Sequence, residues 1–211
     1  MKIEPGQKVI ALGAHPDDIE FGCGGTIMKL KSKQAEVWYV AMTRCNDQFG
    51  DDEKDTLLRE QAAAAEILGI DHTTIHDLPN KELPENRREI MDTMNRLQAD
   101  IEPDLVLIPH LGDPHQDHST VGECAIRTFR SRETILQYEI LRHGSATFTP
   151  NLYVDITDLI DRKIDAVKCY ASQKVKRKFF DVESYRALAR TRGFQSGCEY
   201  AEGLDVYRLY L

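Results

Sequence analysis

The chain has 211 residues, of which 41% are hydrophobic and 29% charged, a balance typical of a soluble globular protein. Its length favours one ordinary domain over residues 1–211. The net charge of −8 argues against nucleic acid as a partner, because phosphate binding needs clustered basic charge. No apolar run approaches the ~20 residues of a membrane span, which argues against a membrane partner.

The cysteines and the N-terminal residues indicate the compartment. The five cysteines are scattered, odd in number and without a C-x-x-C pair, so a disulfide framework is not expected. The first residues have too short an apolar core for a secretory signal. Together these features predict a cytoplasmic protein.

Short apolar runs predict strands, and segments with an apolar period near 3.6 predict helices. In chain order, strands are expected at residues 8–14, 37–42, 73–78, 105–109, 134–141, 152–156 and 206–210. Helices are expected at residues 24–33, 55–68, 84–99, 116–129, 158–171 and 181–191. The alternation of strands and helices predicts an α/β fold with a mostly parallel sheet and right-handed crossovers.

The first candidate site follows the first predicted strand, where the chain turns from strand to helix. Sites in open α/β sheets form at the carboxyl ends of strands. His15 and Asp18 are three residues apart, close enough in a tight turn to face one point. Asp17 lies between them and points slightly elsewhere. This spacing suits two metal ligands with a further carboxylate left as a base.

A second polar cluster follows the strand predicted at residues 105–109. His115 and His118 are again three residues apart, with Asp117 between them. Zinc takes nitrogen and oxygen ligands, and catalytic zinc sites commonly use three protein ligands and a water. His15, Asp18 and one histidine of this cluster would make such a set.

The two motifs together carry a family resemblance. Ala14-His15-Pro16-Asp17-Asp18, paired with the later His115-Gln116-Asp117-His118, resembles the PIG-L/LmbE family of zinc-dependent de-N-acetylases. Residues 64–70 and 200–204 also resemble segments of that family, so the resemblance covers most of the chain. It implies an LmbE-like fold, a Rossmann-like three-layer α/β/α sandwich. It also implies a hydrolase that releases acetate and a free amine from an N-acetylglucosamine-type conjugate.

Matched position by position, the resemblance implies a site for Zn²⁺, or for another divalent metal such as Fe²⁺. Its ligands would be His15, Asp18 and His118. Asp17 is expected to act as general base on the attacking water. His115, as imidazolium, is expected to stabilise the oxyanion or to protonate the leaving amine. Asp117 is expected to orient either His115 or His118, and the spacing does not choose between them.

Two departures from the family pattern concern substrate binding. Relatives usually read Thr-x-Gly-Glu after the second strand, where this chain reads Thr43-Arg44-Cys45-Asn46. Relatives also often carry an arginine at the position of Leu57, where it helps to hold the acyl group or the sugar. We expect Arg44 or Arg59 to take over this substrate contact.

Two further segments have both a functional and a structural interpretation. Gly22-x-Gly24-Gly25 is a faint match to a dinucleotide loop. The preceding motif fills the place where that loop would begin, so close helix–strand packing is the better account. The basic residues 174–178 suit an anionic group such as phosphate or carboxylate, although an exposed face is the more common explanation of such a run.

The expected activity is therefore the zinc-dependent deacetylation of a small amino-sugar conjugate. A soluble glycoside or sugar nucleotide is a better candidate than a lipid, because no membrane segment is present. Two alternatives stay open: a metal-dependent amidase that acts on another conjugate, and a non-catalytic metal- or sugar-binding module, which the altered residues 45–46 would suit. Trimers and hexamers occur among relatives, so a homo-oligomer also stays open.

Overall fold

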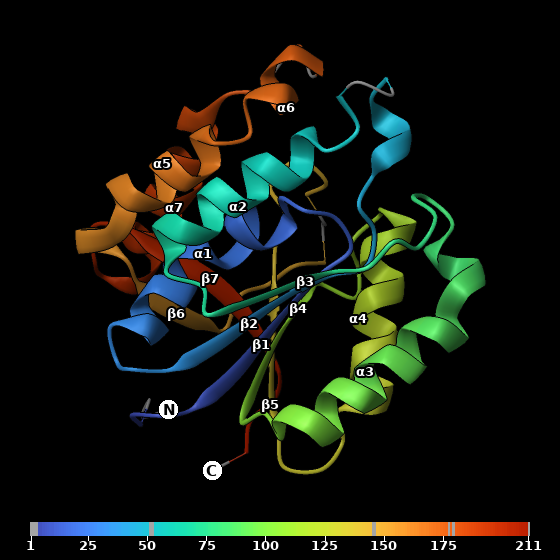
Figure 1. Cartoon of the computed structure of the whole chain (residues 1–211). Coiled ribbons are helices and arrows are strands. Elements are labelled where there is room, and N and C mark those ends of the chain that lie inside the picture. Colours follow the sequence, from blue (N-terminus) through green and yellow to red (C-terminus); the bar gives the residue numbers. More distant parts are fainter. Residues whose placement is uncertain (1–3, 51–52, 145–146, 177, 179, 211) are drawn as a thin grey trace.

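A computed structural model describes residues 4–50, 53–144, 147–176, 178 and 180–210. Within these ranges seven strands form one sheet with helices on both faces (Figure 1). The strands are β1 (Lys8–Gly13), β2 (Glu36–Ala41), β3 (His72–Ile75), β4 (Leu105–Pro109), β5 (Thr134–Tyr138), β6 (Leu152–Asp155) and β7 (Ala201–Arg208). The helices are α1 (Asp18–Lys31), α2 (Thr56–Leu68), α3 (Arg87–Ile101), α4 (Gln116–Thr128), α5 (Ile160–Lys168), α6 (Ala171–Lys176) and α7 (Val182–Ser196). Short 3₁₀ helices are η1 (Asn46–Gln48), η3 (Leu83–Asn86) and η4 (Thr157–Leu159).

The order of the strands places two strand ends side by side. The sheet runs β3-β2-β1-β4-β5-β7-β6, with β1 to β5 parallel and β7 antiparallel to both of its neighbours. The chain builds outward from β1 through β2 and β3, and then returns to place β4 on the other side of β1. The carboxyl ends of β1 and β4 therefore meet where the strand order reverses, which is where open α/β sheets bind ligands.

The central strands bury both of their faces, in two separate apolar cores. In β1, Val9 and Ala11 face the core under α1, α2, α5 and α7, whereas Ile10 and Leu12 face the core under α3 and α4. All four side chains are fully buried. Burial on both faces explains why the strand reads as a continuous apolar run. The expected three-layer α/β/α fold with a mostly parallel sheet is confirmed. No helix within the described ranges has the length and apolar content that a membrane crossing requires.

The last strand begins earlier than the sequence predicts, at Ala201 rather than at residue 206. Glu202 interrupts the apolar pattern of this segment, yet its side chain is buried. Its carboxylate accepts hydrogen bonds from the backbone N–H groups of Gly25 (2.8 Å) and Thr26 (2.6 Å) and pairs with the ammonium group of Lys163. A partner so far away in the sequence cannot be read from local periodicity.

The same ion pair fills a kink in α1. Cys23 has non-helical backbone angles (φ −138°, ψ 21°) inside this helix. A straight helix would pair the carbonyl of Phe21 with the N–H of Gly25. Here Lys163 Nζ donates to the Phe21 carbonyl (3.2 Å), and Gly25 N–H donates to Glu202 (2.8 Å). The two charged side chains therefore satisfy backbone groups at the kink.

The glycines of α1 allow the helix to pack closely on neighbouring segments. A Cβ atom at Gly22 would lie 2.1 Å from Cδ2 of Tyr138 in β5, and one at Gly25 would lie 2.8 Å from Cγ2 of Ile156. These contacts confirm close packing as the role of the glycine cluster. Helix α1 begins at Asp18 and runs through the glycines, whereas the sequence predicts a start at residue 24.

The substitution Gly22→Ala is expected to lower the free energy of unfolding by about 1–3 kcal/mol, because the added methyl group overpacks the contact with Tyr138. Urea-induced unfolding measures this difference. Gly50→Ala is the control, since a Cβ there meets nothing within 4 Å. Equal effects of the two substitutions would contradict the packing account.

A carboxyl group lies fully buried under α1. Glu20 accepts hydrogen bonds from the hydroxyl groups of Tyr170 (2.7 Å) and Tyr39 (3.2 Å). Burial raises the pKa of Glu20 from its ordinary value of 4.5 to about 8, although the hydrogen bond from Tyr170 lowers it. The folded protein therefore keeps this proton over a pH range in which the unfolded chain has lost it.

The pH dependence of stability follows from this difference. The contribution of the Glu20 proton is fully present below about pH 4.5 and is lost as the pH rises through about 8. Glu20→Gln keeps the polar group but cannot ionise. We expect its free energy of unfolding to gain on that of the wild type by about 1.4 kcal/mol per pH unit in this window. The exposed Glu66→Gln serves as control, and a difference between Glu20→Gln and wild type that does not change with pH would contradict the assignment.

Candidate active site

The turn after β1 is closed by one of its own side chains. Asp18 Oδ2 accepts hydrogen bonds from the N–H groups of Ala14 and His15, both at 2.9 Å. The turn is tight, because a Cβ at Gly13 would lie 3.2 Å from the carbonyl oxygen of His15. His15 and Asp18 are both buried, so the turn holds an imidazole and a carboxylate together in a fixed place.

The second motif reaches this turn from the start of α4. His115 caps that helix, since its Nδ1 accepts a hydrogen bond from the N–H of Asp117 (3.2 Å). The first turn of the helix then directs two side chains across the sheet. His118 Nε2 lies 3.1 Å from His15 Nδ1, and Asp117 Oδ2 lies 3.2 Å from His15 Nε2. Residues about a hundred positions apart thus meet at one point.

Two ring nitrogens and one carboxylate converge with the spacing of a metal-ligand set. His15 Nδ1 and His118 Nε2 are 3.1 Å apart, Asp18 Oδ1 lies 3.2 Å from His118 Nε2, and Asp18 Oδ2 lies 3.4 Å from His15 Nδ1. Ligands at 2.0–2.1 Å from a tetrahedral zinc are separated from one another by about 3.3 Å. Ligand atoms of His15, His115 and His118 also lie within 4.8 Å of one another, a looser bound, so the set with Asp18 is the better fit.

A carboxylate behind each ring determines which nitrogen faces the centre. His15 Nε2 lies 3.2 Å from Asp117 Oδ2, and His118 Nδ1 lies 3.0 Å from Asp113 Oδ2. A ring N–H that donates to a carboxylate leaves the other nitrogen with its lone pair available to a metal. Two such lone pairs and a carboxylate oxygen repel one another unless positive charge lies among them.

The raised pKa values of His15 and His118 also indicate that positive charge is favoured at this point. Burial lowers the pKa of His15, but the carboxylates of Asp18 and Asp117 outweigh it and raise the pKa to about 10. Burial likewise lowers the pKa of His118, while Asp18 and Asp113 raise it to about 9. A divalent cation would supply this charge in place of the protons.

The Asp117 carboxylate contacts His15, which is neither of the two histidines that the spacing suggested. The Asp117 side chain is fully buried, and it also accepts the N–H groups of Lys81 (2.8 Å) and Leu83 (3.3 Å). Burial raises its pKa, but the hydrogen bond and charge of His15 lower it below the usual range. The sequence spacing suggested His115 or His118 as its partner, whereas the helix directs this carboxylate to the turn after β1.

His115 lies beside these rings and is stacked on His118, with ring centroids 4.4 Å apart and an interplanar angle of 17°. Burial and the neighbouring histidines lower the pKa of His115 to about 4, which favours a neutral ring rather than the imidazolium expected from the sequence. Because Nδ1 accepts the N–H of Asp117, the proton of the neutral ring is on Nε2. His115 lines the cleft and has an N–H group to offer there.

The converging atoms open into a cleft of about 490 Å³. Asp17 lines it next to Asp18 and is 5% exposed, as suits a base that is screened from bulk water. Arg44 and Arg59, the arginines expected to bind substrate, are not among the described residues that line this cleft. Leu57 does line it.

The geometry of α2 explains the position of Arg59. Residues two apart on a helix point in nearly opposite directions, so Arg59 faces solvent when Leu57 faces the cleft. The Arg59 guanidinium group donates to the hydroxyl of Thr56 (3.0 Å). Arg44 is half-buried and follows the end of β2. The cations found in the cleft wall are instead Lys81, Arg142 and Lys176.

Two residues of the site had no assigned role in the sequence. His143 packs edge-on against His115 and His118, with ring centroids at 5.1 and 5.0 Å. No other histidine lies three residues from His143 in the sequence. The one feature that could have indicated its role is its place after β5, the strand next to β4. The Asp113 carboxylate accepts hydrogen bonds from the backbone N–H of His115 (2.8 Å) and from the His118 ring. The sequence feature that could have indicated this role is its position just before the second motif.

Comparison with known proteins agrees with this geometry. The profile of the PIG-L family, described as GlcNAc-PI de-N-acetylase, matches residues 10–129 and so includes both motifs. The chain is 31% identical to diacetylchitobiose deacetylase of Thermococcus kodakarensis, over 94% of this chain and 82% of that protein. It is 24% identical to the probable N-acetyl-alpha-D-glucosaminyl L-malate deacetylase 2 of Bacillus anthracis, over 82% and 87% of the two chains.

Among solved structures, that of N,N'-diacetylchitobiose deacetylase from Pyrococcus horikoshii matches with a TM-score of 0.80 and 27% identity. The match covers 97% of this chain and 86% of the other. The family profile and the relative from Thermococcus each span more than half of the sequence. The chain therefore belongs to the PIG-L family of de-N-acetylases.

Proposed function

We propose that this protein is a metal-dependent hydrolase that removes the acetyl group from an N-acetylated amino sugar. The observation that carries the proposal is the convergence of His15, Asp18 and His118 beside Asp17 in one cleft. Two similar proteins are named for the deacetylation of diacetylchitobiose and of N-acetyl-alpha-D-glucosaminyl L-malate, which are both N-acetylated sugar conjugates. The proposed products are acetate and the free amine.

His15 Nδ1, His118 Nε2 and the Asp18 carboxylate would hold the metal. Nitrogen and oxygen donors at tetrahedral spacing suit Zn²⁺, and Fe²⁺ is the alternative. When bound, the metal would polarise the amide carbonyl and lower the pKa of water in the cleft to roughly 7. Asp117 and Asp113 would keep the two rings in the orientation that the geometry requires.

The remaining groups of the cleft would move protons and bind charge. Asp17 would take a proton from the attacking water as the oxygen adds to the acetamide carbon. The His115 Nε2–H would donate a hydrogen bond to the developing oxyanion. Asp17 would then return the proton to the nitrogen as the C–N bond breaks, which releases acetate and the amine.

The altered loop after β2 is compatible with this role. Cys45 stands where relatives usually have glycine, and its backbone adopts the left-handed region (φ 56°, ψ 35°) that glycine favours. The loop therefore keeps the backbone conformation of a glycine at this position. The substitution at this position therefore does not by itself argue for the non-catalytic module.

The substitution Asp17→Asn is expected to lower kcat by ~10²–10⁴-fold and to leave the metal content unchanged, because it removes a base and not a ligand. Free-amine release from diacetylchitobiose, N-acetylglucosamine and N-acetylglucosaminyl malate measures the first quantity, and elemental analysis the second. Asp158→Asn, the same change at an exposed position in η4, is the matched control.

The other outcomes of this experiment separate the alternatives. Loss of the metal from Asp17→Asn would make Asp17 a ligand. A metal-loaded wild type that releases amine from none of the three sugar compounds, but does so from an added acetamide without a sugar, would be an amidase of another class. Metal binding without release from any compound would favour the non-catalytic module.

Removal of the metal with a chelator is expected to abolish acetate release and to lower the Tm. Zn²⁺ or Fe²⁺ added at a hundred times its Kd should then raise stability by about 2.7 kcal/mol. Asp18→Ala should lose this gain, and Asp113→Asn should weaken metal affinity by about 10–100-fold, since it alters the partner of His118. Thermal unfolding across a metal titration measures the stability gain of the wild type, its loss in Asp18→Ala and the metal affinity of Asp113→Asn. An acetate assay measures the effect of the chelator on activity. An undiminished gain in Asp18→Ala would place the metal elsewhere.

A further inference from the structure

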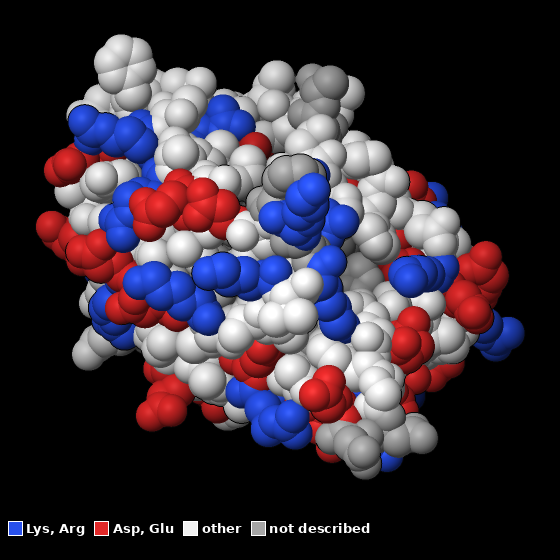
Figure 2. All heavy atoms as spheres, turned by 90° about the horizontal axis from the view of Figure 1, so that it is seen from above, with Lys and Arg blue, Asp and Glu red and all other residues white. Residues whose placement is uncertain are grey.

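The ion pair of Lys163 and Glu202 lies in the interior of the protein, outside the cleft. Lys163 belongs to α5 and Glu202 to β7, and each side chain is 4% exposed. Charged side chains usually lie at the surface, and Figure 2 shows Lys, Arg, Asp and Glu side chains spread over one face of this molecule. A buried ion pair is often no more stabilising than apolar side chains of similar size, because both charges lose their hydration. Stability alone therefore does not account for this pair.

The pair joins the two halves of α1 across its kink at Cys23. Lys163 Nζ donates to the carbonyl oxygen of Phe21 (3.2 Å), before the kink. Glu202 Oε1 accepts the N–H of Gly25 (2.8 Å), after the kink, and also pairs with Lys163 Nζ. The two side chains are thus inserted where a straight helix would pair Phe21 directly with Gly25, and such an insertion bends a helix.

A straight helix would satisfy the same backbone groups without any buried charge. The Thr26 N–H and hydroxyl both lie 2.6 Å from Glu202 Oε2. In a regular helix this N–H would pair with the carbonyl of Gly22 instead. The ion pair is therefore required for the bend in α1 rather than for the helix itself.

The bend sets the direction of the first turn of α1, which reaches the cleft. Asp17, Asp18 and Phe21 all line the cleft. The Asp17 carbonyl accepts the N–H of Phe21 (3.0 Å), and the Phe21 carbonyl is the one that Lys163 holds. One turn of helix thus connects the buried ammonium group to the backbone of Asp17.

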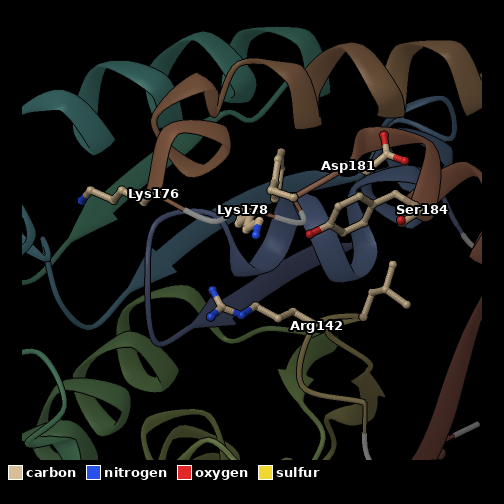
Figure 3. Close-up of a pocket in the computed structure, with 8 residues that line it drawn as sticks. Arg142, Lys176, Lys178, Asp181 and Ser184 are labelled. Carbon is tan, nitrogen blue, oxygen red and sulfur yellow. The ribbon is translucent and has the colours of Figure 1, made fainter.

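A second helix holds the same turn through the ring of Phe21. This ring packs against Tyr185 of α7, with ring centroids 4.9 Å apart. Figure 3 shows the start of α7 from a neighbouring cavity, with Asp181 and Ser184 on its wall. The first turn of α1 is therefore fixed by α7 at a side chain and by Lys163 of α5 at the backbone.

Asp18 depends less on the bend than Asp17 does. Its carboxylate accepts the N–H groups of Ala14 and His15, both at 2.9 Å, and these bonds fix it within the turn after β1. A change in the direction of α1 is therefore expected to move Asp17 more than the converging atoms of Asp18 and His15.

We propose that Lys163 and Glu202 are positioning residues for the reaction, because the bend that they impose on α1 aims Asp17 into the cleft. This inference rests on the proposed function, which makes Asp17 the base. It also gives a role to residues 200–204, whose resemblance to the family had none. A base works only within hydrogen-bond reach of the attacking water, so its direction is as important as its identity.

The double substitution Lys163→Met/Glu202→Leu tests this role, because it removes both charges and lets α1 close its own hydrogen bonds. The metal-loaded variant should keep its metal and a Tm near that of the wild type. Its kcat for diacetylchitobiose should fall by about 10²-fold, the typical cost of a ~1 Å misplacement. The loss should fall on kcat rather than on KM, because a base acts in the transition state. Lys163→Met alone should lower the Tm, since it leaves a buried carboxylate unpaired.

Two further variants separate the bend from a general loss of charge or of stability. Lys168→Met/Asp165→Leu removes an exposed ion pair (2.9 Å) from the same helix, α5, and should leave kcat and Tm close to those of the wild type. Thr26→Val keeps the shape of the side chain and the ion pair but removes the hydroxyl bond to Glu202. This milder change should lower kcat by about two- to tenfold.

Crystal structures of the wild type and the double variant show the bend and the Asp17 carboxylate without any assay. If the wild type releases no amine, but α1 straightens and Asp17 moves in the variant, the positioning role stands and the deacetylase proposal fails. If the wild type is active and the double variant matches its kcat, the pair is structural only and the deacetylase stands. Loss of the metal together with kcat, or a Tm as low as that of Lys163→Met, would also overturn the positioning role.

Discussion

The site depends on the carboxylate of Asp18, which uses its two oxygens for two purposes. Oδ2 accepts the N–H groups of Ala14 and His15 and so closes the turn at the end of β1. Oδ1 lies 3.2 Å from His118 Nε2, across the sheet. The group that shapes the turn is therefore also a candidate metal ligand, and the turn it shapes carries a second one. Local fold and ligand geometry cannot vary independently here, which suits a site that must hold atoms to within a few tenths of an ångström.

The second requirement is that β1 and β4 are neighbours in the sheet. His15 and His118 are 103 residues apart and meet only because the chain returns from β3 to the free side of β1. The start of α1 is also held from a distance, since the buried pair of Lys163 and Glu202 satisfies backbone groups at its kink. The convergence of His15, Asp18 and His118 is thus a property of the assembled sheet and helices, and neither motif alone provides it.

The parts of this structure that the sequence predicts are those with a local physical signal. Apolar periodicity indicates the strands and most helices, and an i, i+3 pair after a buried strand indicates where a site lies. Partners across the sheet have no such signal: Asp117 contacts His15 rather than a ring of its own helix, and Glu202 is buried because Lys163 lies opposite. His143 joins the histidine cluster from a third strand end, without any motif spacing. Local chemistry thus predicts which segments matter, whereas the pairing of individual atoms depends on tertiary contacts.

The division of the cleft between scaffold and loops has a consequence for specificity. The converging ligand atoms come from the ends of β1 and β4, which are central and paired on both sides. Among the described residues, the cations of the cleft come from elsewhere: Lys81 from the segment between β3 and η3, Arg142 from the loop after β5 and Lys176 from the end of α6. Leu57 presents an apolar side chain from α2. Loops tolerate change better than buried strands. Substitutions in these segments can therefore change the wall of the cleft without displacing the atoms that converge around Asp18.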